Sequence, residues 1–108
     1  MTQLLHFKSV FKPLILSGAK TSTTRYSPKK LGPAVAVIGS RYKPERFADL
    51  RITYICRTDW ASVIDNHYKE EGFSSPAEML NFLKKEKLMH GSVLDAVWLH
   101  GFGLARGI

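Results

Sequence analysis

The sequence predicts one α+β domain, a small mixed β-barrel with short helices. Strand-like stretches recur along the 108 residues, and helix-like stretches lie between only some of them. Because strands and helices do not alternate strictly, a doubly wound parallel sheet is disfavoured. No repeat, low-complexity tract or linker divides residues 1–108, and this length is typical of a single domain.

The strand predictions depend on apolar runs and on alternation. A continuous apolar run over 34–38 predicts a buried strand, and alternation over 50–57 predicts a half-buried one. In the second, Cys56 shares a face with apolar residues and is expected to be a small core hydrophobe. Further strands are expected over 4–8, 21–25 and 93–102, loops over 27–33 and 40–46, and a fraying tail over 101–108.

Three helices are predicted from spacing and end signals. The first covers 11–17, with Pro13 in its first turn and Gly18 after its last residue. The second follows Asp59 as N-cap and continues to 71. The third begins after Ser75, with Pro76 and Glu78 completing a capping pattern, and ends in the exposed lysines Lys84, Lys85 and Lys87.

The segment Gly18–Tyr26, G-A-K-T-S-T-T-R-Y, concentrates hydroxyl and cationic side chains without a carboxylate. As a strand it would place Thr21, Thr23 and Arg25 on one face and Ser22 and Thr24 on the other, with Lys20 at its entrance. Such a set suits an anion or a polar nucleotide. The alternative is a solvated edge strand whose hydroxyls satisfy backbone groups.

Glu71 continues the apolar stripe of the second predicted helix, so we expect it to be partly covered, and a carboxylate there can have a raised pKa or a fixed partner. A threonine hydroxyl needs a base before it becomes a nucleophile, and a desolvated lysine can serve as that base. The residues that could carry such chemistry are therefore Lys20, Thr21, Thr23, Arg25 and Glu71. A structural ion pair between Arg25 and Glu71 is the alternative.

The charge of the chain favours a polyanionic partner. Sixteen Lys and Arg against nine Asp and Glu give a net charge of +7, which adds salt-dependent affinity for nucleic acid phosphates. The alternative is that the protein is simply basic. The expected phosphate contacts, besides Thr21 and Arg25, are Lys29, Lys30, Arg41, Lys43 and Arg46.

Metal, cofactor and membrane functions are not predicted. The four histidines and Cys56 have no recognised metal-ligand spacing, and no dinucleotide or P-loop fingerprint is present. A single cysteine, with no apolar run long enough to span a membrane, predicts a cytoplasmic protein without disulfides.

The segment F-K-P-L-I-L-S-G-A-K-T-S-T-T-R resembles the opening of ASCH domains, relatives of the PUA fold, whose signature is G-x-K-x-x-E-x-R. Gly18, Lys20 and Arg25 match it, and Thr23 replaces the glutamate. That replacement is similar to the bacterial N4-acetylcytidine amidohydrolase branch, whose motif is G-x-K-T-x-T-x-R. The resemblance covers most of the chain, from about Phe7 to Trp98.

This resemblance implies a PUA-like fold and two functions that remain open. One is an RNA- or nucleoside-binding module in RNA metabolism. The other is deacylation of N4-acetylcytidine, in which Lys20 and Thr23 match two reactive residues of that branch. The run E-E-G-F-S-S-P-A-E-M implies Glu71 as the third, with Glu70 as a weaker candidate. Ribonuclease activity is a weaker alternative.

The chain departs from the family pattern after the predicted loop, where the family usually has Gly-Asp and this chain has Gly32-Pro33. The departure removes a carboxylate that we expect near the entrance to the pocket.

Overall fold

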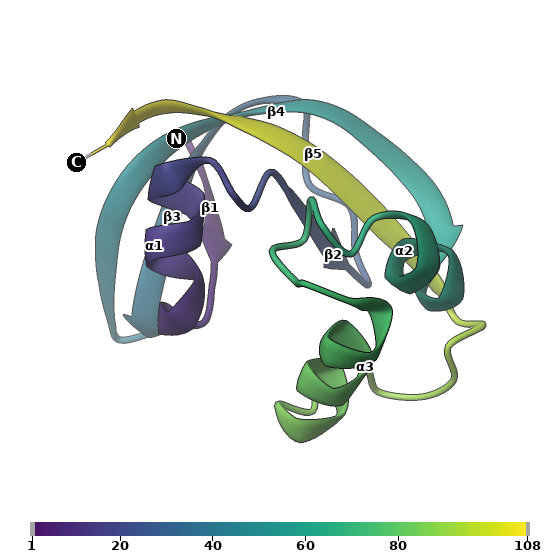
Figure 1. The fold of residues 1–108 in the computed structure, drawn as a ribbon. Coiled ribbons are helices and arrows are strands. Elements are labelled where there is room, and N and C mark those ends of the chain that lie inside the picture. Colours follow the sequence, from purple (N-terminus) through teal and green to yellow (C-terminus); the bar gives the residue numbers. More distant parts are fainter. Residues whose placement is uncertain (1, 108) are drawn as a thin grey trace.

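The structure is a computed structural model that describes the backbone of residues 2–107 and the side chains of residues 2–105. Five strands, a short 3₁₀ turn and three short α-helices confirm the α+β class (Figure 1). In chain order the elements are β1 (Gln3–His6), η1 (Ser9–Phe11), α1 (Lys12–Ser17), β2 (Ser22–Arg25), β3 (Gly32–Ser40), β4 (Lys43–Asp59), α2 (Trp60–Asn66), α3 (Pro76–Lys85) and β5 (Ala96–Gly107).

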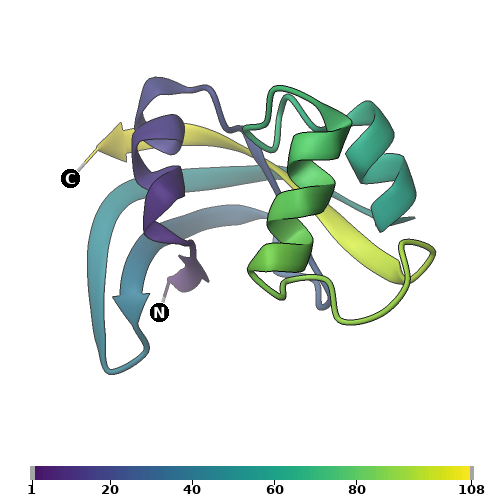
Figure 2. The same ribbon diagram turned by 60° about the horizontal axis from the view of Figure 1, so that its bottom comes forward.

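The strands form one arched sheet in the order β1-β3-β4-β5-β2. β1 is parallel to β3, and the other neighbouring pairs are antiparallel. The predicted barrel is therefore not closed, because the two four-residue edge strands, β1 and β2, do not pair with each other. In Figures 1 and 2 the sheet arches over the helices, with α1 on one side and α2 and α3 on the other.

The predictions of a loop over 40–46 and of a fraying tail were wrong because β4 and β5 are both longer than expected. The chain turns at 41–42, and β4 begins at Lys43, so 40–46 forms the end of the β3–β4 hairpin. The tail predicted to fray is the second half of β5, which pairs with β4 as far as Gly107. Long antiparallel pairing thus orders segments whose composition suggested loops.

A β-bulge in β4 overturns the prediction for Cys56. The register of β4 against β5 shifts between Ile52 and Tyr54, which leaves Thr53 without a paired residue. An extra residue reverses the alternation of faces beyond it. Ile52 is buried and Ile55 packs against the core, whereas Tyr54 and Cys56 are exposed.

The helix ends follow the predicted signals, but α2 is shorter than predicted. Asp59 accepts a hydrogen bond from the backbone N–H of Ser62 at 2.7 Å, and Ser75 accepts one from Glu78 at 3.1 Å. Gly18 ends α1 in the left-handed conformation with φ of 84°. α2 stops at Asn66, and 67–72 forms a series of turns that carries Glu71.

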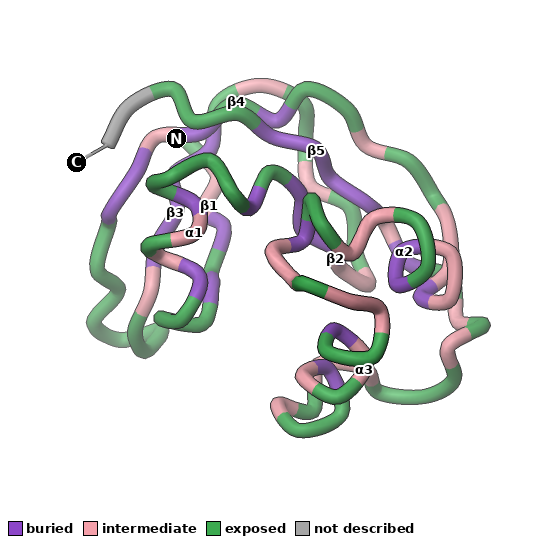
Figure 3. Tube along the Cα trace, in the orientation of Figure 1, coloured by how far each residue is buried: buried purple, intermediate pink, exposed green. Residues whose placement is uncertain are grey.

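Two hydrophobic clusters form the core. Figure 3 marks the buried residues along the chain in purple. The first packs α1 against β1, β3 and the middle of β4. The second packs α2 and α3 against the first half of β5. Phe73 packs against both clusters, so it marks the seam between them.

Candidate functional site

The turns after α2 are joined to the start of β2 through the backbone. The N–H groups of Thr21 and Ser22 both donate to the carbonyl of Glu70, at 2.7 and 3.0 Å. Gly72 allows the close approach, because it has φ of 101° and a Cβ there would lie only 3.2 Å from Cδ1 of Leu14. These contacts bring Glu71 to β2, although the two are far apart in sequence.

Glu71 lies at the centre of a buried cluster that we call the polar floor, made of Lys20, Ser22, Thr24 and Glu71. The Lys20 ammonium donates to the Glu71 carbonyl at 2.7 Å and lies 3.7 Å from its Oε1. Ser22 donates to Oε2 of Glu71 at 2.6 Å, and Thr24 donates to the same oxygen at 3.3 Å. The Lys20 and Glu71 side chains are only 3% and 5% exposed, so both are held almost without water.

Burial lowers the pKa of Lys20 below its ordinary value, and the nearby Glu71 carboxylate only partly opposes this change. The Lys20 ammonium also lies 4.3 Å from the centre of the Phe11 ring. A lysine whose pKa is lowered loses its proton more readily, which is the property that a general base needs.

The opposite face of β2 makes different contacts. Arg25 donates through Nε to the Thr23 hydroxyl at 3.2 Å and through its terminal nitrogen to the His6 carbonyl at 2.7 Å. Its guanidinium lies 5.2 Å from the centre of the Phe7 ring. The alternative ion pair between Arg25 and Glu71 is not formed among the described residues, where Glu71 pairs with Lys20 instead.

A pocket of about 220 Å³ opens beside the polar floor, in the seam between the two core clusters. Its walls are mainly aromatic. Tyr26 is fixed there, because its hydroxyl accepts from Trp60 Nε1 at 3.0 Å and from the backbone N–H of His90 at 2.9 Å. The lining residues are His6, Phe7, Lys8, Phe11, Lys20, Thr23, Thr24, Arg25, Tyr26, Trp60, Glu71, Phe73, Phe82, Leu83, Leu88 and His90.

The structure brings together four of the predicted site residues, which all line this pocket: Lys20, Thr23, Arg25 and Glu71. The other predicted contacts lie elsewhere. Thr21 is exposed, the hairpin residues Arg41, Lys43 and Arg46 are exposed, and Lys30 lines a separate shallow hollow that also includes Pro33. Lys29 is half-buried, and its backbone N–H donates to His100.

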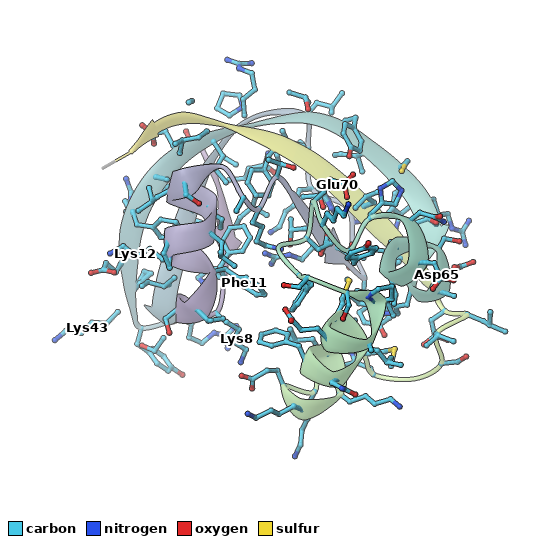
Figure 4. All side chains as sticks on the ribbon, viewed as in Figure 1. Lys8, Phe11, Lys12, Lys43, Asp65 and Glu70 are labelled. Atoms are coloured by element: carbon cyan, nitrogen blue, oxygen red, sulfur yellow. The ribbon has the colours of Figure 1, made fainter. Side chains whose placement is uncertain are left out.

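Several site residues were missed from the sequence. Ser22 and Thr24 were placed together on one face of the strand, but no pattern indicated that this face would meet Glu71. The aromatic walls come from five separate segments, and Lys8 precedes the 3₁₀ turn. Figure 4 shows Lys8 and Phe11 lying between α1 and α3.

Two kinds of feature are absent from the described part of the chain. No group of three or more His, Cys, Asp or Glu side chains there could hold a metal ion. No described helix is both long and apolar enough to cross a bilayer.

The sequence matches no known protein-family model and no curated protein. Several solved structures match the fold over nearly the whole chain. Protein EF3133 from Enterococcus faecalis, described under the family DUF984, is 16% identical with a TM-score of 0.71, and the match covers 100% of this chain and 82% of that one.

An ASCH domain from Lactobacillus crispatus is 16% identical with a TM-score of 0.66, over 97% of this chain and 80% of the other. A mutant of the ZmASCH protein from Zymomonas mobilis is 16% identical with a TM-score of 0.65, over 97% and 73% of the two chains. The resemblance to ASCH domains is thereby confirmed at the level of the fold.

Proposed function

We propose that this chain, which shares the fold of ASCH-domain proteins, uses its pocket to bind a single nucleobase of a modified nucleoside or of RNA. The observation that carries the proposal is the position of the polar floor beside an aromatic-walled pocket. Aromatic side chains stack on any base, and buried hydroxyl, ammonium and carboxylate groups can hydrogen-bond to its polar edge.

The size of the pocket supports one base rather than several. Sites for drug-sized ligands usually enclose about 300–1,000 Å³. At about 220 Å³, the pocket is below that range and suits a base with part of its ribose. A longer RNA would therefore lie outside the pocket with one base inserted.

Binding is tested by calorimetric titration of the protein with cytidine, N4-acetylcytidine and ribose. We expect both nucleosides to bind and ribose alone to give no signal. Replacing Thr24 by Val removes one hydroxyl of the floor at nearly constant volume, and we expect nucleoside affinity to fall about fivefold, as for the loss of one hydrogen bond. The matched control is Thr53→Val, at an exposed position of β4 outside the pocket. This variant should bind the nucleosides like the parent protein. Absence of heat with every nucleoside would exclude the proposal.

A second candidate is hydrolysis of N4-acetylcytidine, favoured by the buried Lys20 whose pKa is lowered beside hydroxyls and a carboxylate. In this reaction Thr23 would attack the acyl carbonyl while Lys20 accepts its proton. Lys20 would pass this proton to the Glu71 carboxylate, which would give it to the departing amine of cytidine as the C–N bond breaks. Glu71, again a carboxylate, would then take a proton from the water that attacks the acylated threonine, and return of that proton to the Thr23 oxygen would release acetate.

The geometry adds a competing nucleophile. Thr23 hydrogen-bonds to Arg25, whereas Thr24 also lines the pocket and contacts Glu71 directly. Incubation with N4-acetylcytidine, followed by chromatography of released cytidine, separates the two when Thr23→Val and Thr24→Val are compared. Turnover lost only in Thr23→Val assigns that nucleophile, and turnover lost only in Thr24→Val assigns the other. No release by the parent protein would leave the pocket as a binding site.

A further inference from the structure

The charges around the pocket differ between its buried floor and its exposed mouth. Inside, the Lys20 ammonium faces the Glu71 carboxylate, the only carboxylate among the described residues that line the pocket. At the surface, the exposed lining residues are His6, Lys8 and His90, which we call the mouth. All three bear nitrogen groups that donate hydrogen bonds, and none is acidic.

Lys8 is the cationic side chain of this mouth. Among the described side chains, no carboxylate pairs with its ammonium, whereas Lys12, four residues later, pairs with Glu45 at 3.4 Å. The mouth therefore has a positive charge that nothing in the described part of the chain compensates. An anionic group of the ligand, held just outside the aromatic walls, would supply the missing charge.

We infer that the ligand of the pocket is a nucleotide rather than a free nucleoside, with its phosphate bound at the mouth by Lys8. This inference rests on the proposed function, because the base enters the pocket and so places the sugar and phosphate at its opening. A phosphate has up to two negative charges and three acceptor oxygens, and lysine binds it as a point charge. The imidazoles of His6 and His90 can donate further hydrogen bonds to the same oxygens.

Two sources of this phosphate are possible, a mononucleotide and an RNA strand. The test is calorimetric titration at low salt with cytidine, cytidine 5′-monophosphate, cytidine 3′-monophosphate and a cytidine dinucleotide. We expect at least one phosphate-bearing ligand to bind roughly fivefold more tightly than cytidine, the gain for an exposed ion pair of good geometry. The added affinity should decrease as salt is raised. Preference for the dinucleotide over both monophosphates would indicate RNA, and the reverse would indicate a mononucleotide.

Lys8→Ala and Lys12→Ala form a matched pair of variants. Both remove one lysine from the same segment, exposed Lys8 or half-buried Lys12, so they change net charge equally, but only Lys8 lines the pocket. We expect Lys8→Ala to abolish the gain due to phosphate while cytidine binds as before, and Lys12→Ala to keep the gain.

Equal affinity for cytidine and every phosphorylated ligand in the parent protein would overturn this inference and leave the proposed function standing. Equal losses in the two variants would overturn it as well, since they would show an effect of net charge alone. If no ligand bound at all, both the proposed function and the inference would fail.

Discussion

The two faces of β2 use four neighbouring residues for different purposes. Ser22 and Thr24 donate to the buried Glu71 carboxylate, whereas Thr23 and Arg25 bond to each other, and Arg25 also bonds to the His6 carbonyl. The first face satisfies a charge in the interior. The second orients a cation that lines the pocket. Alternation along one short strand thus points Ser22 and Thr24 toward the buried carboxylate and Thr23 and Arg25 away from it, while Thr24 also lines the pocket.

The largest effect should come from removing the charge that the first face holds. Glu71→Ala leaves the buried Lys20 without its partner, and breaking a buried pair typically costs about 3–5 kcal/mol. The free energy of unfolding, measured with urea, should fall by that amount. Glu70→Ala is the matched control, because its side chain is exposed and its contact to β2 runs through the backbone. Similar losses in the two variants would contradict a buried, structurally required Glu71.

The next largest effect should be the difference in stability between a variant of the first face and a variant of the second. Ser22→Ala removes a 2.6 Å hydrogen bond to a buried carboxylate, and such bonds to charged groups contribute about 1.5–3 kcal/mol. Thr23→Val should cost less than about 1 kcal/mol, because water in the pocket can replace the partner that Arg25 loses. Urea unfolding of both variants measures the difference. The reverse order of stability would show that the second face, not the first, holds the structure together.

The loss of folding stability at acid pH should depend on His100, which pairs across the sheet with Thr23 and is fully buried. Its Nε2 accepts from the backbone N–H of Lys29 at 2.9 Å, so Nδ1 bears the hydrogen and faces the Trp98 and Thr23 carbonyls. Burial lowers the pKa of His100 below its ordinary value, although these carbonyls oppose the change, and the charged groups acting on it are Arg25 and Glu71.

Because the unfolded chain takes up a proton at this histidine before the folded one does, stability is complete above about pH 6.5. As the pH is lowered below about 6.5, the free energy of unfolding should fall by up to about 1.4 kcal/mol per pH unit, until the pH reaches the pKa of His100 in the folded protein. Urea unfolding between pH 7 and pH 5 measures the slope. His100→Gln should flatten it, and the matched variant His90→Gln, at an exposed position, should not. A slope unchanged in His100→Gln would exclude this histidine as the cause.

The smallest effect on stability should come from breaking a solvent-exposed ion pair. Lys12 and Glu45 lie 3.4 Å apart, but their side chains are 37% and 59% exposed. Such pairs usually contribute less than about 1 kcal/mol, so Lys12→Ala should change the free energy of unfolding by about 0.5 kcal/mol or less. A loss comparable to that of Glu71→Ala would show that burial does not distinguish the two pairs.

Part of the pocket lining could be predicted, because Lys20, Thr23 and Arg25 belong to one short motif. The burial of Glu71 was also expected, but from a helix predicted to reach residue 71, whereas α2 ends at Asn66 and a series of turns carries Glu71. Their gathering in one pocket could not be predicted, since it depends on the backbone contacts between Glu70 and the start of β2. The phosphate contacts assigned to the 40–46 hairpin rested on charge alone, and charge does not indicate position.

The fold shows the same division. The sequence by itself determined the α+β class, the caps of the helices and the buried runs, because those features depend on neighbours within a few residues. Only the tertiary structure decided that β4 reaches Lys43, that β5 reaches Gly107, and that Thr53 forms a bulge which exposes Cys56. The physical reason is that strand length and register are set by pairing between distant segments. The partner of the Glu71 carboxylate was decided in the same way, by contact across the fold rather than along the chain.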